Sequence, residues 1–370
     1  MLAILRPLLI QHSRKGIFMA KKVVIGMSGG VDSSVAAYLL KKEGYEVVGV
    51  TMKTWQDREA DGSELAMVKD ARAVAERLGI EYHVVDFKEA FKKHVMDYFV
   101  DEYLQGRTPN PCVVCNRFVK WEALLHYANE VGADFIATGH YARIDQFPNG
   151  RYAICNSVTA AKDQTYALYN LKQEQLAHTI MPVGAYTKDE IRAIAEEIGL
   201  NVAQKKDSME ICFIPDDDYA KFIEAHADRQ VPPPGNFVSV AGEVLGQHKG
   251  ITHYTIGQRK GLGIALGAPA FVVAIRPETN EVVLGTNNDV FTTKLYANRL
   301  NAMSIPEFVD GMELKAKIRY SHAGSMCKIT RTGEDEICCE FAEPVRAVTP
   351  GQAVVFYDGE HVAGGGTIVR

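Results

Sequence analysis

One segment near the start of the chain, residues 22–44, constrains the fold more than any other. It begins with the apolar run Lys-Val-Val-Ile-Gly, typical of a buried parallel strand, and ends with a run that predicts a helix closed by Gly44. Between them stands Met-Ser-Gly-Gly-Val-Asp-Ser-Ser, residues 27–34. Such a turn before a helix N-terminus presents backbone N–H groups to an anion, and the helix dipole adds to the attraction. The segment predicts a phosphate-binding loop, with further hydroxyl donors at Ser28, Ser33 and Ser34.

The loop lacks the residues that mark two other kinds of phosphate site. It contains no Gly-Lys-Ser/Thr, as kinases and GTPases require. The pattern also argues against a dinucleotide site, because G-x-G-x-x-G is missing and no acidic residue ends the next apolar run, residues 47–52. The string S-G-G-x-D-S instead resembles the pyrophosphate loop of ATP pyrophosphatases, which split ATP between its α and β phosphates. The resemblance implies ATP with Mg²⁺ as the ligand.

The order of predicted elements indicates an α/β domain followed by β-rich domains. Alternation over residues 21–143 predicts a doubly wound parallel sheet, with strands at 23–27, 46–52, 81–87 and 134–139 and helices at 32–43, 66–78, 88–104 and 118–131. A capping box, Thr187 to Glu190, predicts one further helix. Beyond the prolines at 232–234 the pattern becomes short strands, at 271–275, 281–284, 313–320, 326–330, 337–341 and 353–357. We therefore expect a catalytic domain at 19–229, a small β-rich domain at 230–298 and a C-terminal β-barrel at 299–370.

Composition fits a globular protein of the cytoplasm. The chain has 370 residues, 47% hydrophobic and 24% charged, which predicts two or three domains. Seven cysteines in a chain of this length do not make a disulfide framework and favour a reducing compartment. No apolar run is long enough to span a membrane. Residues 1–18 are basic and apolar; we expect an upstream start codon or a disordered extension, with a transit peptide as the alternative.

Three further segments reduce the number of possible substrate classes. Thr-Pro-Asn-Pro-Cys-Val-Val-Cys, residues 108–115, places Cys112 and Cys115 in a proline-bounded loop ahead of a helix. A mixed segment at 207–215 carries Cys212, and the polar triplet Lys-Asp-Gln, residues 162–164, leads into a predicted helix. Together with Ala-Thr-Gly-His-Tyr-Ala-Arg from residue 137 and Gly-Gln-Arg-Lys-Gly-Leu-Gly from residue 257, they resemble the bacterial tRNA-specific 2-thiouridylases (MnmA family). The resemblance runs from about residue 21 to the end.

That resemblance implies a sulfurtransferase reaction on tRNA. The C2 oxygen of the wobble uridine, a poor leaving group, would be adenylated by ATP and then replaced by sulfur. The residue matching Cys212 would carry the sulfur as a persulfide, and the one matching Cys115 would be the partner nucleophile, the two closing a disulfide as sulfur is released. A cysteine desulfurase or a sulfur-relay protein would supply the sulfur. Neither DNA nor a membrane is an expected partner.

By motif position the resemblance also implies binding roles. ATP would be held by Gly26, Met27, Ser28, Gly29, Gly30, Val31, Asp32 and Ser33, with Met52 and Gly139 near the adenosine. The target base, flipped out of its stack, would lie against Asn110, Pro111 and Cys112. The tRNA would be contacted by His140, Lys162, Asp163, Gln164, Arg319, Tyr320 and Gln352. His140 has a second interpretation, as a core histidine.

The chain departs from the family pattern at Cys112, where many members have aspartate. With Cys115 and Cys212 it makes three thiols, which are enough to hold an iron–sulfur cluster with one open iron position. Persulfide transfer without a cluster, zinc binding and an inert cysteine are the alternatives. The other four cysteines are expected to fill apolar sites: Cys155, Cys327, Cys338 and Cys339.

Charge supports a nucleic acid partner only locally. The net charge is −5, yet residues 311–332 carry five cations against one acid, and residues 241–276 carry four against one. Two other functions stay open on the residues alone. One is a different ATP pyrophosphatase, acting on a small molecule or another tRNA base. The other is a non-enzymatic RNA-binding protein that holds iron–sulfur or zinc.

Overall fold

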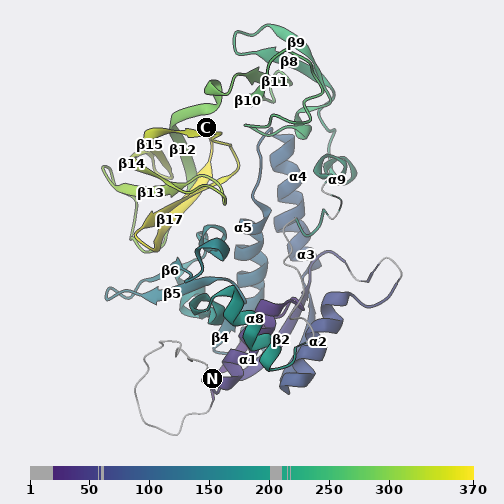
Figure 1. Ribbon diagram of the computed structural model, residues 1–370, viewed down its shortest axis with the longest axis vertical. Helices are drawn as coiled ribbons and strands as arrows, with labels where there is room; N and C mark the ends of the chain where they lie inside the picture. The colour runs from purple at the N-terminus through teal and green to yellow at the C-terminus, as the bar shows by residue number, and fades with distance from the viewer. Residues whose placement is uncertain (1–19, 57, 60–61, 201–210, 215, 217) are drawn as a thin grey trace. The chain divides into compact units, whose positions relative to one another are not determined.

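The computed structural model describes residues 20–370 except 57, 60–61, 201–210, 215 and 217 (Figure 1). The described chain divides into two compact units. The first comprises residues 20–92, 115–200 and 360–362, and the second residues 93–114, 211–359 and 363–370. The expected N-terminal extension, residues 1–18, lies outside the described residues, as does most of the stretch leading to Cys212.

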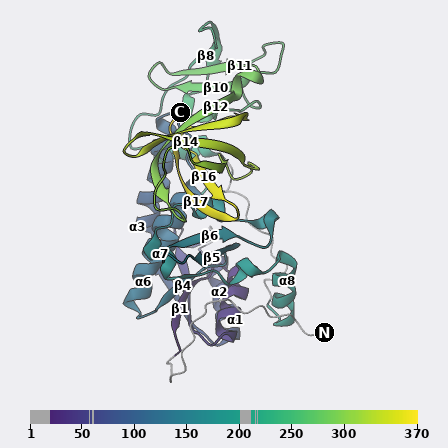
Figure 2. The same cartoon turned by 90° about the vertical axis from the view of Figure 1, so that its left-hand side faces the viewer.

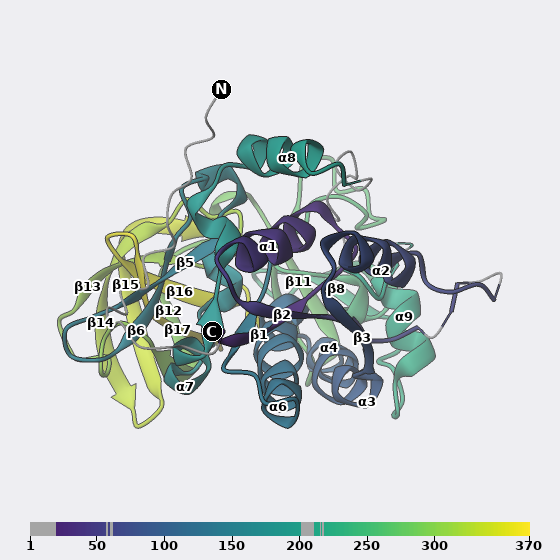
Figure 3. The ribbon, with the colours of Figure 1, turned by 90° about the horizontal axis from the view of Figure 1, so that it is seen from below.

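A five-stranded parallel sheet forms the centre of the first unit. Its strands, in the order β3-β2-β1-β4-β7, are Glu81–Asp86, Glu46–Lys53, Lys22–Gly26, Phe135–Ala137 and Thr179–Ile180. Helices α1 (Val31–Lys42) and α2 (Ala66–Leu78) cover one face and α6 (Leu124–Glu130) covers the other (Figure 3). The predicted doubly wound parallel sheet is confirmed.

The order of the strands fixes where a ligand can bind. From β1 the chain passes outward through β2 to β3 and then returns to β4 on the opposite side of β1. At such a reversal the two neighbouring loops diverge and leave a crevice at the carboxyl ends of the strands. By this rule a ligand is expected between residues 27–30, after β1, and residues 138–140, after β4.

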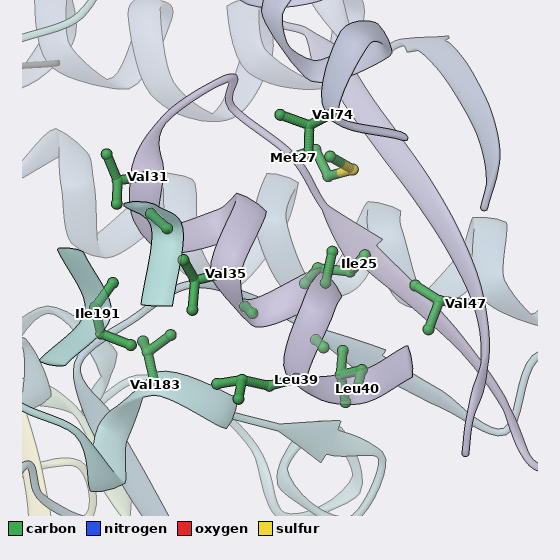
Figure 4. Packing of buried hydrophobic residues seen from close by; sticks show 14 of the residues in the cluster. Ile25, Met27, Val31, Val35, Leu39, Leu40, Val47, Val74, Val183 and Ile191 are labelled. Atoms are coloured by element: carbon green, nitrogen blue, oxygen red, sulfur yellow. The ribbon is translucent and has the colours of Figure 1, made fainter. Parts of the chain in front are cut away.

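The core of this unit explains why β1 lies at the centre of the sheet. Val23, Val24 and Ile25 have no exposed surface, as a strand covered on both faces requires. On α1, the side chains of Val35 and Leu39 are buried and lie toward those of Val183 and Ile191 (Figure 4). A helix packed along its length in this way holds its N-terminus firmly at the crevice.

Two predicted helices differ from the observed ones. The predicted helix 88–104 is interrupted: α3 (Lys88–Phe91) is followed by a π-helical stretch, η1 (Lys92–Met96), and then by α4 (Asp97–Leu104). The predicted helix 118–131 begins earlier, with α5 (Pro111–Cys115), continues as the π-helical η2 (Asn116–Ala123) and ends with α6. Proline at the first helical position explains the early start, because it lacks only an N–H that would have no partner in the helix.

The predicted capping box is confirmed. Helix α8 (Lys188–Glu197) begins after Thr187, whose Oγ1 accepts a hydrogen bond from Glu190 N at 3.2 Å. In return Glu190 Oε2 accepts from Thr187 N at 2.7 Å. The cap sets the first residue of α8, Lys188, which has a role at the site described below.

The first unit also contains elements that the sequence patterns did not predict. A hairpin of β5 (Ala142–Gln146) and β6 (Tyr152–Asn156) follows β4, and the short helix α7 (Gln173–Ala177) precedes β7. Two further turns of 3₁₀ helix precede α7, η3 (Ala160–Lys162) and η4 (Thr165–Leu168), and η5 (Pro182–Ala185) precedes α8.

The second unit contains two β structures and the helices α4 and α9 (Tyr219–His226). A four-stranded sheet has the order β10-β11-β8-β9, with strands Phe271–Arg276, Glu281–Gly285, Gly235–Ser239 and Val244–His248. The 3₁₀ turns η6 (Ile251–His253) and η7 (Asn288–Val290) flank it.

The last strands form the predicted C-terminal antiparallel barrel (Figure 2). They are β12 (Phe291–Ala302), β13 (Glu313–Lys317), β14 (Ser325–Gly333), β15 (Glu336–Arg346), β16 (Ala353–Asp358) and β17 (His361–Ile368). Strand β12, which was not predicted, pairs with β15 and also with β17, so it closes the strands β12 to β17 into a barrel. Across the described residues, none of the helices combines the length and the apolar character that crossing a membrane requires.

Candidate functional site

The loop between β1 and α1 has the geometry of an anion site. Its first residue is fixed to β2, since Met27 N donates to Val50 O and Thr51 Oγ1 donates to Met27 O, both at 2.8 Å. Gly30 is the N-cap of α1 and has no side chain with which to cap it. The first bond of the helical ladder runs from Ser34 N to Gly30 O at 3.3 Å. The N–H groups of residues 31–33 therefore precede that ladder, where an anion can accept from them.

Two of the predicted hydroxyl donors meet in this loop and the third does not. Ser28 Oγ lies 3.3 Å from Ser33 Oγ, and Ser28 N donates to Ser33 Oγ at 3.2 Å. Ser34 is fully buried, and its Oγ donates to Gly30 O at 2.7 Å. The helix backbone therefore already uses the Ser34 hydroxyl, contrary to the expectation that it would face phosphate. Ser33 Oγ also reaches Gly30 O, at the longer distance of 3.3 Å.

Two glycines are required here for steric reasons. Gly29 has φ of +66°, and a methyl group in place of its hydrogen would lie 2.7 Å from Met67 O. A methyl group on Gly139 would lie 2.7 Å from Ser33 N. The loop after β4 thus presses directly on the start of α1, which brings Gly139 to the phosphate loop. Met52 also reaches this edge, since its Cε would lie 3.4 Å from a methyl group on Gly26.

Asp32, on the first turn of α1, has two partners that the sequence patterns did not identify. Lys188 Nζ lies 2.9 Å from both carboxylate oxygens, and the hydroxyl of Tyr141 donates to Oδ1 at 2.7 Å. The Lys188 ammonium also lies over the Tyr141 ring, 5.7 Å from its centroid. In the sequence, Lys188 stands out only as part of the capping-box motif, and Tyr141 only as the residue after His140. Their position after the ends of β4 and η5 was the signal that could have identified them.

His140 is a neutral imidazole at physiological pH. Its ring is half-buried, lies 5.3 Å from the Trp121 ring and has Nδ1 2.8 Å from Thr138 Oγ1. Burial, and to a lesser degree the charge of Lys120, holds the pKa of His140 well below its usual value. If His140 meets tRNA, it does so as a hydrogen-bonding group and not as a cation.

The triplet at 162–164 is held by local hydrogen bonds. The carboxylate of Asp163 accepts from Ser157 N at 2.9 Å and from the hydroxyl of Thr165 at 2.5 Å. These bonds hold the backbone in two 3₁₀ turns and not in the predicted helix. The side chain of Gln164 accepts from Tyr141 N at 2.8 Å, while Lys162 is half-buried.

The predicted sulfur-transfer cysteines have different environments. Cys112 and Cys115 both lie in α5, three residues apart, and not in a loop as the prolines suggested. Cys112 and Cys212 are exposed, and Cys115 is half-buried. Of the other four, Cys155, Cys327 and Cys339 are buried as expected, whereas Cys338 is half-buried.

Residues 108–109, just before the predicted target-base residues, are anchored to the barrel segment 350–352. Gln352 Nε2 donates to Thr108 O at 3.0 Å and to Pro109 O at 2.9 Å, and Thr108 N donates to Pro350 O at 2.9 Å. Asn110 follows, and its carbonyl accepts from Val113 N at 3.2 Å at the start of α5. Pro111 is buried. Gln352, predicted as a tRNA contact, thus holds the backbone that leads to Cys112.

The two barrel residues predicted to contact tRNA differ in how available they are. Tyr320 has 54% of its surface exposed, which is large for an aromatic side chain. Arg319 donates from Nη1 to Arg346 O at 2.8 Å, so part of its guanidinium is occupied by the barrel itself.

A second cluster of metal-ligand residue types is already balanced by a cation. Asp145, Cys155 and His361 offer ligand atoms within 4.8 Å of one another, and His361 Nε2 lies 2.8 Å from Asp145 Oδ2. Arg143 Nη2 donates to Cys155 Sγ at 3.0 Å, which puts a positive charge where a metal ion would bind. Burial raises the pKa of Cys155 to about 12, so its thiol stays protonated.

Family comparisons agree with this geometry. Residues 21–216 match the family described as tRNA methyl transferase HUP domain, residues 220–286 the tRNA methyl transferase PRC-barrel domain, and residues 292–368 the aminomethyltransferase beta-barrel domain. The parallel sheet, the glycine-capped loop and the HUP match define an ATP-utilising protein of the PP-loop class.

Relatives that match almost the whole chain identify its family within the PP-loop class. The chain is 64% identical over 357 residues to the tRNA-specific 2-thiouridylase MnmA of Lachnoclostridium phytofermentans, covering 95% of this chain and 100% of that protein. It is 53% identical over 360 residues to the MnmA of Clostridioides difficile, covering 96% and 99%. The chain belongs to the family of tRNA-specific 2-thiouridylases, which confirms the resemblance seen in the motifs. A solved structure, the U34-tRNA thiolase NcsA from Methanococcus maripaludis, is 22% identical with a TM-score of 0.34, covering 55% of this chain and 64% of that chain.

Proposed function

We propose that this protein replaces the C2 oxygen of the wobble uridine of tRNA with sulfur, converting ATP to AMP and pyrophosphate. The observation that carries the proposal is the start of α1, where a glycine N-cap and the Ser28–Ser33 pair meet Gly139. This anion site belongs to a chain that resembles 2-thiouridylases over almost its whole length.

In the first step ATP activates the uridine. The C2 oxygen attacks the α-phosphorus, the bond from that phosphorus to the bridging oxygen of the β-phosphate breaks, and pyrophosphate leaves. The N–H groups at the start of α1 and the hydroxyls of Ser28 and Ser33 would hold the phosphates. Mg²⁺ bound with ATP would offset their negative charge.

In the second step sulfur displaces AMP. The terminal sulfur of a Cys212 persulfide attacks C2, and the bond between C2 and the adenylated oxygen breaks. The Cys115 thiolate then attacks the Cys212 sulfur, which forms a disulfide and leaves sulfur on the uridine. An external dithiol must reduce that disulfide before the next cycle. The exposed position of Cys212 supports delivery of sulfur by a cysteine desulfurase or a relay protein. A reducing cytoplasm suits this chemistry.

A cluster route makes a different use of the same cysteines. Cys112, Cys115 and Cys212 would ligate an iron–sulfur cluster, and its open iron would hold the sulfide that attacks C2. Iron and labile sulfide in anaerobically purified, active protein would support this route. A colourless preparation with full activity would support persulfide transfer.

Binding of tRNA is proposed for the barrel and the triplet at 162–164. Exposed Tyr320 and the cations between residues 311 and 332 would meet RNA backbone and bases. Asn110, Pro111 and Cys112 would receive the flipped base.

The decisive test is mass spectrometry of tRNA from cells that lack this gene, complemented with wild type, Cys115→Ala or Cys212→Ala. We expect wobble 2-thiouridine to disappear on deletion, to return with wild type and to stay absent with either variant. Its survival in the deletion strain would contradict the proposal, provided that the strain has no second thiouridylase.

A further inference from the structure

Tyr141 connects two parts of the proposed site that were expected to act on different substrates. It follows His140 after β4, and its side chain is buried, with 3% of the residue exposed. Its hydroxyl donates to Asp32 Oδ1 at 2.7 Å, on the first turn of the phosphate-loop helix. Asp32 itself is 27% exposed, so its carboxylate is held at the surface of the crevice.

The backbone of Tyr141 is fixed on both sides by one other residue. Tyr141 N donates to Gln164 Oε1 at 2.8 Å, and Gln164 N donates to Tyr141 O at 3.0 Å. A residue held by both its N–H and its C=O cannot shift without breaking these bonds. The position of the Tyr141 ring, and with it the position of its hydroxyl, therefore depends on Gln164.

The Asp32 carboxylate is held from two directions. Lys188 Nζ contacts both oxygens at 2.9 Å, and the Tyr141 hydroxyl donates to Oδ1 at 2.7 Å. Lys188 supplies charge, whereas a single hydroxyl donor restricts the rotation of the carboxylate. Without the hydroxyl, Asp32 would keep its counter-charge and lose one of the three contacts that hold its orientation.

We propose that Tyr141 is a positioning residue for the ATP site and that Gln164, expected to contact tRNA, sets Tyr141 and through it Asp32. Gln164 then has two roles: it faces tRNA, and it maintains the phosphate loop before any tRNA arrives. The inference rests on the proposed function, because it assumes that ATP binds at this loop.

The test measures ATP affinity in the absence of tRNA, by calorimetry on the full-length protein. We expect Tyr141→Phe and Gln164→Ala each to weaken ATP binding about three- to tenfold. Because both changes act on one chain of contacts, the double variant should be little worse than either single one. Tyr38→Phe, on the same helix as Asp32 but near its far end, is the matched control and should bind ATP normally.

A conservative variant separates the two roles of Gln164. Gln164→Glu keeps the oxygen that accepts from Tyr141 N, so ATP affinity should stay within twofold of wild type. The added negative charge should still weaken tRNA binding, measured by filter retention at fixed salt. This variant also keeps the proposal testable if Gln164→Ala does not fold.

Unchanged ATP affinity in Gln164→Ala, with only tRNA binding reduced, would overturn the inference. Equal loss of ATP affinity in the Ala and Glu variants would overturn it too, because the acceptor oxygen would then be irrelevant. A wild-type protein that binds no ATP at all would instead contradict the proposed function.

Discussion

The Lys188 ammonium lies 2.9 Å from both oxygens of the Asp32 carboxylate, although 156 residues separate the two in the chain. The lysine begins α8 and the aspartate lies in the first turn of α1, so each stands at a helix N-terminus. A lysine at a helix start opposes the helix dipole, so its presence there indicates that the carboxylate needs a cation.

Replacing Lys188 should affect both stability and ATP use. Lys188→Met leaves a partly buried carboxylate without its cation, so we expect the free energy of unfolding to fall by about 1–3 kcal/mol. Pyrophosphate release should fall at least tenfold. Urea unfolding and a pyrophosphate assay measure the two effects. The double variant with Asp32→Asn should lose less stability than the two single variants together, and additive losses would contradict a direct pairing.

Adding a methyl group at Gly139 should disturb the phosphate loop. In Gly139→Ala the new carbon would lie 2.7 Å from Ser33 N, a backbone atom that cannot move aside cheaply. We expect a loss of about 1–3 kcal/mol of stability and weaker ATP binding. Gly333→Ala is the control, because its new carbon would come no closer than 3.5 Å to a neighbour. Similar effects in both variants would argue against a tight contact at Gly139.

The Nε2–H groups of Gln352 should matter more for the thiolation rate than the size of its side chain. Gln352→Glu keeps the shape but removes the Nε2–H groups that bond Thr108 O and Pro109 O. We expect thiolation to slow at saturating tRNA, because the segment leading to Cys112 loses its anchor. Steady-state kinetics over a range of tRNA concentrations separates this from a lost tRNA contact, which would raise KM and leave kcat unchanged.

The cysteines should differ sharply in their reaction with iodoacetamide. Cys112 and Cys212 are exposed, whereas burial raises the pKa of Cys155 to about 12 and keeps it protonated at pH 8. Peptide mass spectrometry of native protein should find Cys112 and Cys212 modified at least tenfold faster than Cys155. Similar rates in native protein, not only in urea, would contradict the burial of Cys155.

His140 should make the protein less stable in mild acid. Its pKa is lowered in the folded state, so below pH 6.5 the unfolded chain takes up a proton that the native protein does not. The free energy of unfolding then falls as pH decreases, by at most about 1.4 kcal/mol per pH unit from this residue. His140→Gln should lose less stability between pH 7 and pH 5 than wild type. The exposed His126→Gln is the control, and an equal change in both would contradict a special role for burial at His140.

The parts of the fold that sequence patterns predicted are those where the signal is local. The apolar strand before Ser28 and the capping box at Thr187 each specify their element within a few residues, and both were confirmed. Strand β12 escaped prediction because only Leu295 and Ala297 among its twelve residues are fully buried, so the alternation is too short to recognise. The domain boundaries at 229–230 and 298–299 stay predictions.

The site was harder to predict because its contacts are not local. Cys112 lies in a helix that starts at Pro111, although the prolines there favoured a loop. The partners of Asp32 come from residues 141 and 188, and no spacing rule connects such distant positions. The family resemblance predicts Gln352 and Gln164 as tRNA contacts, and only the structure gives them hydrogen bonds inside the protein.

The glycine at the start of α1 has a consequence for attempts to engineer a more stable variant of this protein. Serine or aspartate at an N-cap usually stabilises a helix by about 1 kcal/mol relative to a residue that cannot cap it, and engineers often introduce one for that reason. At Gly30 a serine or aspartate would place its own side-chain oxygen against the N–H groups of the first turn of α1. Its Cβ would also lie 3.3 Å from Ser28 Oγ, so the new side chain would crowd the loop and exclude the nucleotide. The uncapped end of the helix is what leaves room for a ligand.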